Sequence, residues 1–123
     1  MIKFIVIDDE PYVGELFPKL INWEEFNFKF AGVFSSAADA LSWLESHTCD
    51  VIFTDISMPD ISGTELAKIC SEKYPDISIV FFSAHRDFDY AMEAIKYKVF
   101  DYILKPFSYD DLNKTIAALR KHV

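Results

Sequence analysis

The sequence is poor in glycine and cysteine, and each shortage excludes a class of protein. Only three of the 123 residues are glycine and no glycine-rich phosphate loop is present, so the chain is not built to hold a nucleotide. The two cysteines, Cys49 and Cys70, lack the spacing of metal ligands. We therefore expect two buried or half-buried free thiols, which fits a reducing compartment.

The sequence also lacks long apolar segments and an excess of positive charge. No apolar run approaches the ~20 residues that a membrane span needs, and no signal peptide is visible, so we expect a cytoplasmic protein without a membrane anchor. The formal net charge is −8, which repels a phosphate backbone. We therefore expect the domain itself to bind no nucleic acid and to favour a protein, a cation or a small phosphorylated molecule.

What the chain does contain is a regular alternation of two hydrophobic periods. Continuous apolar runs are typical of parallel strands that are covered on both faces, whereas a 3.6-residue period indicates helices between them. A chain of this length is sufficient for one domain, residues 1–123. The pattern predicts an α/β fold, a single doubly wound (βα)5 domain. The expected strands are residues 2–7, 28–34, 51–54, 77–82 and 100–104.

Signals for the helix ends agree with this alternation. Ser36, Ser62 and Ser108 each precede an acidic residue by three positions, which is the pattern of a hydroxyl N-cap. Pro11 suits the first turn of the first helix. Pro18 removes a backbone donor from the same helix, so we expect a kink or an early end near residues 14–17.

Polar side chains follow the predicted strands at the points where the strands end. Asp8 and Asp9 follow the first strand, Asp55 the third, Ser83 the fourth and Lys105 the fifth. Ligands of an open parallel sheet bind at these carboxyl ends, so we expect the groups to meet. Gathered carboxylates repel one another, and Mg²⁺ is the hard cation that best relieves this. Acids that hold magnesium beside a lysine suit phosphoryl transfer, for which a carboxylate is a competent nucleophile.

At this point the chain resembles a known family, the receiver domains of two-component response regulators. The resemblance rests on "FIVIDDEP", "DVIFTDISMPDISG", "IVFFSA" and "DYILKPF", in this order, and it covers nearly the whole chain. It implies a flavodoxin-like or CheY-like five-stranded parallel sheet of order 2-1-3-4-5. It also implies a signalling switch that a phosphoryl group activates.

The resemblance assigns roles to the acidic residues. Asp55 would accept the phosphoryl group and, with Asp9, would bind Mg²⁺ directly. Asp8 would act on the metal through water, and the backbone carbonyl of Ser57 would complete the protein ligands.

It also assigns roles on the phosphoryl side. Lys105 would contact the phosphoryl group, oriented by a cis peptide bond to Pro106. Ser83 would supply a hydroxyl to a phosphoryl oxygen, and Tyr102 would turn inward when Ser83 moves. Ala84 would leave the site open.

The implied partner is a sensor histidine kinase. "INWEEFNF" and "DFDYAMEAIKYKVFDYILKP" are similar to receivers that precede AraC-type DNA-binding domains. We therefore favour a receiver excised from a protein with a transcriptional output domain over the alternative, a stand-alone receiver. Activation would shift the face made by strand 4, the fourth helix, strand 5 and the fifth helix. The same face could serve a homodimer on activation.

Simpler interpretations remain open for individual residues. Asp8 and Asp9 could merely favour the N-terminus of the first helix. Ser83 could be a loop hydroxyl, and Tyr102 could only pack in its strand.

Two other functions remain open for the whole chain. A small Mg²⁺-dependent phosphatase would also use an aspartyl phosphate, but Ser57 stands where such enzymes place a general-acid Asp. A phosphorylation-independent interaction module would lack one of the pocket residues, and the sequence retains them all. The favoured interpretation is therefore a phosphoryl acceptor that is not an enzyme acting on a separate substrate.

Overall fold

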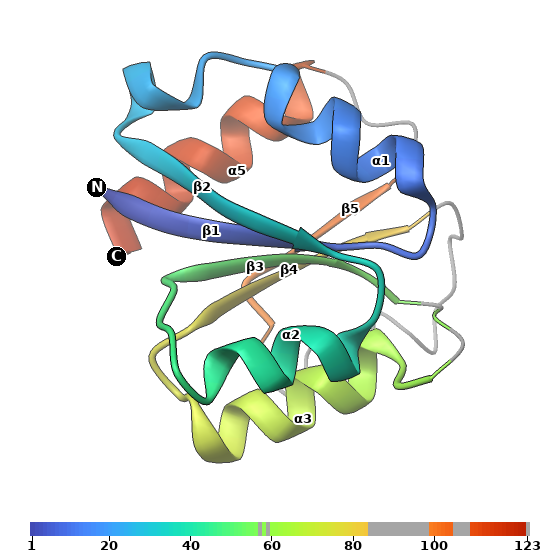
Figure 1. Ribbon diagram of the computed structural model, residues 1–123. Coiled ribbons are helices and arrows are strands. Elements are labelled where there is room, and N and C mark those ends of the chain that lie inside the picture. Colours follow the sequence, from blue (N-terminus) through green and yellow to red (C-terminus); the bar gives the residue numbers. More distant parts are fainter. Residues whose placement is uncertain (57, 59, 84–98, 105–108, 123) are drawn as a thin grey trace.

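A five-stranded parallel sheet forms the centre of the molecule in the computed structural model, which describes residues 1–56, 58, 60–83, 99–104 and 109–122 (Figure 1). The strand order is β2-β1-β3-β4-β5. Each strand begins and ends within one residue of the predicted range, so the predicted α/β fold and strand order are confirmed. The strands are β1 (Ile2–Ile7), β2 (Phe28–Phe34), β3 (Val51–Asp55), β4 (Ser78–Ser83) and β5 (Asp101–Leu104).

Helices cover both faces of this sheet (Figure 1). One face carries α1 and α5, and the other carries α2 and α3. In the described part of the chain, no helix is long and apolar enough to cross a membrane. The predicted fourth helix falls in residues 84–98, outside the described residues. The helices are α1 (Pro11–Leu16), α2 (Ala37–Leu44), α3 (Gly63–Lys73) and α5 (Tyr109–His122), with short 3₁₀ turns at Phe17–Lys19 and Trp23–Phe26.

The first helix is short because of its two prolines. Pro11 occupies the first turn, where a missing N–H costs nothing. Pro18 cannot donate to an α-helical hydrogen bond, and the α-helix ends at Leu16 and tightens into a 3₁₀ turn around Pro18. The expected early end is confirmed.

Serine side chains cap α2 and α3 as the sequence predicts. The Oγ atom of Ser36 accepts a hydrogen bond from the backbone N–H of Asp39 at 3.2 Å. The Oγ atom of Ser62 accepts one from the N–H of Glu65 at 3.1 Å. Ser108, the third predicted cap, lies outside the described residues.

Alternate residues of the strands divide between two cores. Phe4 and Val6 point toward α1 and α5, whereas Ile5 and Ile7 point toward α2 and α3. The first core is rich in aromatic rings, and the ring centroids of Phe4 and Trp23 lie 4.4 Å apart. These four consecutive β1 residues are 0% exposed, so this part of β1 is buried on both faces, as its apolar run indicates. Other members of the first core include Phe17, Phe28, Phe53 and Phe82.

The two cysteines belong to the α2 and α3 side of the core. Cys49 and Cys70 are both buried and free, as expected. Burial, followed by the negative charge of Asp50, raises the pKa of the Cys49 thiol to about 12. Burial raises the pKa of the Cys70 thiol to about 11. Both groups therefore stay protonated near neutral pH, and the thiolate, which is the reactive form, is disfavoured.

The start of α3 lies directly against the end of β3. The backbone N–H of Gly63 donates to the carbonyl of Ile56 at 2.7 Å. A Cβ atom at position 63 would lie 2.6 Å from the carbonyl oxygen of Asp55 and 2.8 Å from the Cα atom of Ile56. Since both contacts are to backbone atoms, a side chain at Gly63 would push α3 away from β3.

We predict that Gly63→Ala destabilises the domain by about 1–3 kcal/mol because it overpacks this contact. Gly32→Ala is the matched control: its Cβ would lie 3.7 Å from the Phe34 ring, an ordinary contact. Neither glycine has a positive φ angle, so the backbone conformation penalises neither substitution. The control should stay within about 1 kcal/mol of wild type. Urea unfolding of the three proteins measures the difference, and equal stability of both variants would contradict the prediction.

Candidate functional site

The strand order brings the ends of β1 and β3 together. From β1 the chain continues to β2 on one side, and β3 then pairs with β1 on the other side, so the order reverses between β1 and β3. Such a reversal opens a crevice at the carboxyl ends of the strands. Ile7 pairs with Thr54 in the sheet, so Asp8 and Asp55 each follow one member of an aligned pair.

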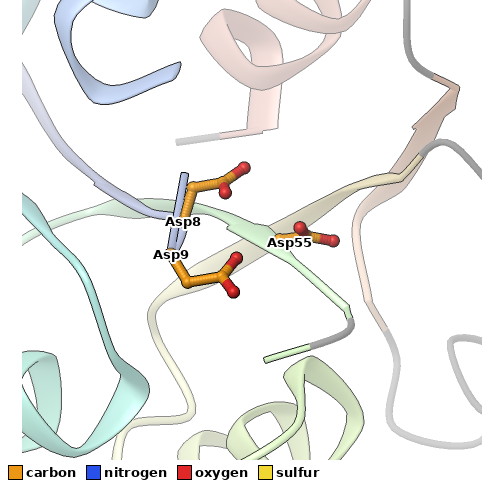
Figure 2. A group of neighbouring side chains, drawn as sticks. All are labelled: Asp8, Asp9 and Asp55. Atoms are coloured by element: carbon orange, nitrogen blue, oxygen red, sulfur yellow. The ribbon is translucent and has the colours of Figure 1, made fainter. Parts of the chain in front are cut away.

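Three carboxylates gather at these strand ends (Figure 2). Asp8, Asp9 and Asp55 each have an oxygen atom within 4.8 Å of the oxygens of the other two. Asp8 is 3% exposed and Asp55 is 8% exposed, whereas Asp9 is open to solvent. The predicted meeting of the first and third strand acids is therefore confirmed. Among the described residues, this is the one group of three or more Asp, Glu, His or Cys side chains whose ligand atoms lie close enough together to hold a metal ion.

Backbone contacts hold Asp8 in place at the end of β1. Its N–H donates to the carbonyl of Phe34 at 3.0 Å, which joins the end of β1 to the end of β2. Its Oδ1 atom accepts from the N–H of Glu10 at 2.9 Å. Asp8 thus also supports the start of α1, the simpler role that the sequence left open. While it accepts this hydrogen bond, the Asp8 carboxylate also belongs to the cluster with Asp9 and Asp55.

The other buried acid, Asp55, ends β3 beside backbone groups that fix its position. The hydroxyl of Thr54 donates to the Asp55 carbonyl oxygen at 2.9 Å. Gly63 packs against the same carbonyl, as described above. The main chain that carries the Asp55 carboxylate is therefore held by its own strand and by the start of α3.

The donor set fits a hard divalent cation. Carboxylate oxygens are the ligands that Mg²⁺ and Ca²⁺ prefer, and one exposed acid leaves the site open to solvent. Two of the three acids are almost buried, where mutual repulsion is poorly screened by water. A cation bound here would neutralise charges that the fold holds together.

Several predicted site residues fall outside the described residues: Ser57, Ala84, Lys105 and Pro106. The side chain of Ser83 is also outside that part, although its backbone ends β4 and pairs with Leu104. Phe82, the residue before Ser83, pairs with Asp55, so the end of β4 lies at the same edge of the sheet as the carboxylates. The roles of all these residues stay predictions.

Tyr102 lies in β5 and is half-buried. Its ring meets that of Phe81 edge to face, with centroids 6.5 Å apart. The neighbouring Asp101 connects β5 to α5, because its Oδ2 atom accepts a hydrogen bond from the hydroxyl of Thr115 at 2.6 Å. This packing is compatible with a structural role for Tyr102 and with a switch role, so the switch role stays a prediction.

Sequence reasoning did not single out two residues next to the site. Gly63 directly contacts the Asp55 backbone, and its signal was a rare glycine at a helix start shortly after the third strand. Asp60 accepts a hydrogen bond from the N–H of Ala38, 22 residues away in the chain. No local sequence pattern predicts a contact between residues that lie this far apart in the chain.

Comparison with known proteins supports the resemblance. Residues 4–117 match the family described as the response regulator receiver domain. The DNA-binding transcriptional regulator NtrC of Proteus hauseri is 34% identical over 118 residues, which are 96% of this chain and 24% of NtrC. The chain spans less than half the length of this relative and of a similar response regulatory protein of Staphylococcus epidermidis.

Solved structures are similar over almost the whole chain. The REC domain of AraT, a response regulator from Geobacillus stearothermophilus, has a TM-score of 0.89 at 33% identity, covering 98% of this chain and 93% of that one. The isolated REC domain of RcsB from Salmonella enterica, solved with the phosphomimetic BeF₃⁻, has a TM-score of 0.88 at 25% identity, covering 98% and 88%. With the family match, the sheet order and the carboxylate cluster in agreement, this chain belongs to the response regulator receiver domain family.

Proposed function

We propose that Asp55 accepts a phosphoryl group from a phosphohistidine of a sensor histidine kinase, with Mg²⁺ held by Asp8, Asp9 and Asp55. The observation that carries this proposal is the carboxylate cluster at the β1 and β3 ends. A cation site next to a nearly buried carboxylate is the arrangement that phosphoryl transfer needs. The BeF₃⁻ form of the RcsB receiver, a relative of the same fold, adds support.

In this mechanism an oxygen of the Asp55 carboxylate is the nucleophile. The bond between phosphorus and the donor imidazole nitrogen breaks as the bond to the Asp55 oxygen forms, and the nitrogen keeps the electron pair. Bound Mg²⁺ would supply charge neutralisation at the phosphoryl oxygens. Asp8 and Asp9 would hold that charge at the end of β1, and the backbone contacts of Asp55 would keep its carboxylate in line for attack.

The remaining site roles belong to the same proposal. The backbone carbonyl of Ser57 would complete the metal ligands, and Lys105, before Pro106, would pair with the phosphoryl charge. Ser83 would donate its hydroxyl to a phosphoryl oxygen beside the small Ala84. A shift of Tyr102 would then report the event on the β5 side of the sheet.

The output of the longer protein is also a proposal. The chain spans 24% and 47% of the length of the two curated relatives named above. We propose a DNA-binding domain of AraC type, on the resemblance of residues 21–28 and 87–106. A homodimer formed on activation would use the face around β5 and α5, where Tyr109 is 60% exposed.

The family match supports an acceptor over a hydrolase or a phosphorylation-independent module. A hydrolase would release phosphate from small phosphoesters over many turnovers. An acceptor would take up at most one phosphoryl group per chain, and a phosphorylation-independent module would take up none.

We predict that beryllofluoride binds this protein in the presence of Mg²⁺ and that Asp55→Asn abolishes the binding, because the neutral amide cannot hold the phosphoryl analogue. Titration calorimetry measures the binding. Asp50→Asn is a matched control, since Asp50 precedes the same strand and its carboxylate accepts the N–H of Lys3 at the opposite end of the sheet. Binding that survives in Asp55→Asn would contradict the assignment of the acceptor.

We also predict that Mg²⁺ alone stabilises the fold. At ten times its dissociation constant, a cation that binds only the folded state adds about 1.4 kcal/mol and so raises the Tm by several degrees. Asp9→Asn should raise the Tm without Mg²⁺, because it relieves repulsion, and should shrink the increment that Mg²⁺ adds. Thermal melts with KCl at matched ionic strength separate binding from screening. Identical melts with and without Mg²⁺ would argue against a cation site.

A further inference from the structure

Asp60 links the segment that follows β3 to the start of α2. Its Oδ2 atom accepts a hydrogen bond from the backbone N–H of Ala38 at 3.1 Å. The two residues are 22 positions apart, and they belong to different βα units of the fold. Figure 1 shows that the start of α2 and the end of β3 lie at the same edge of the sheet, the edge that carries the carboxylate cluster.

The N-terminus of α2 therefore has two acceptors of different origin. Ser36, directly before the helix, accepts the N–H of Asp39, while Asp60 accepts the N–H of Ala38. The first N–H groups of a helix lack partners within the helix, and they favour negative charge. Of these two hydrogen bonds, the one to Asp60 joins the helix to another segment of the chain.

The chemical state of Asp60 agrees with this contact. Burial alone would raise the pKa of the Asp60 carboxyl, but hydrogen bonds from backbone N–H groups outweigh it and hold the pKa below its usual value. These N–H groups belong to Ile61, Ala38, Asp60 itself and Ala37, so they come from both the segment and the helix. The carboxylate is thus charged at neutral pH, and its hydrogen bond from Ala38 joins it to the helix.

Apolar contacts and one backbone bond anchor the rest of the described segment. Ile56, directly after Asp55, is fully buried in the same core as Ala37, the first residue of α2. Met58 and Ile61 are partly buried against that core. Gly63 closes the segment through its hydrogen bond to Ile56. Among the described residues of this segment, Asp60 is the one that adds a hydrogen bond to α2.

We propose that Asp60 is a positioning residue for the phosphoryl acceptor: by binding the N-terminus of α2, it fixes the segment that follows Asp55. This inference rests on the proposed function of Asp55. The segment connects Asp55 to α3 and contains Ser57, so its position decides where the groups next to the acceptor stand. A structural change at the start of α2 would reach the acceptor through the same bond.

The test compares three variants of the protein. Asp60→Ala removes the acceptor, and Asp60→Asn keeps an oxygen that can accept the N–H of Ala38. Ser36→Ala is the matched control, because it removes the other cap of the same helix and leaves the segment bound. The readouts are the Tm, amide hydrogen exchange, and the rate of phosphorylation by acetyl phosphate with Mg²⁺, followed on a phosphate-affinity gel.

We expect Asp60→Ala and Ser36→Ala to lower the Tm to a similar extent, because each loses one cap. Only Asp60→Ala should speed amide hydrogen exchange in residues 56–63. The same variant should slow phosphorylation by about tenfold, because a small displacement of the reacting groups lowers the reaction rate. Asp60→Asn should restore most of the wild-type rate and exchange. Ser36→Ala should keep the wild-type rate.

Two results would overturn the inference while leaving the proposed function intact. The first is an Asp60→Ala variant that is phosphorylated as fast as Ser36→Ala. The second is exchange in residues 56–63 that stays at the wild-type level in Asp60→Ala. If the wild-type protein takes up no phosphoryl group, the proposed function fails and this inference fails with it, whatever the exchange data show for the bond between Asp60 and α2.

Discussion

The electrostatic repulsion among three carboxylates is the constraint around which this fold is organised. Asp8, Asp9 and Asp55 stand with their oxygens within 4.8 Å of one another, and two of them are almost buried. The acids are carried by the ends of β1 and β3, which pair in the middle of a sheet that is packed on both faces. The stability of the two cores thus holds charges together that a cation and a phosphoryl group can use.

The hydrophobic pattern was sufficient to predict the sheet, and the reason is physical. A strand such as β1 is buried on both faces, so its sequence must be continuously apolar, and this signal is strong and local. The strand order was predicted from the resemblance to receiver domains, because the rules for parallel βα units leave more than one order open. Because ligands bind where that order reverses, the meeting of Asp8 with Asp55 could be predicted from their positions after apolar runs.

Contacts between segments that are far apart in the chain could not be predicted from the sequence. Asp60 binds α2, and Asp101 binds Thr115 of α5, yet nothing in the local sequence distinguishes either acid from a solvated one. Gly63 shows the same limit, because its need for space comes from the Asp55 backbone and not from its own conformation. These bonds connect helices to strand ends on both faces of the sheet.

The central claim is that, of the three clustered carboxylates, Asp55 alone accepts the phosphoryl group. Mass spectrometry after incubation with acetyl phosphate and Mg²⁺, with borohydride reduction to mark the acyl phosphate, tests it most directly. The account predicts a single modification per chain, located at Asp55 and absent when EDTA removes the metal. Modification at Asp8 or Asp9, or labelling that does not depend on Mg²⁺, would contradict it.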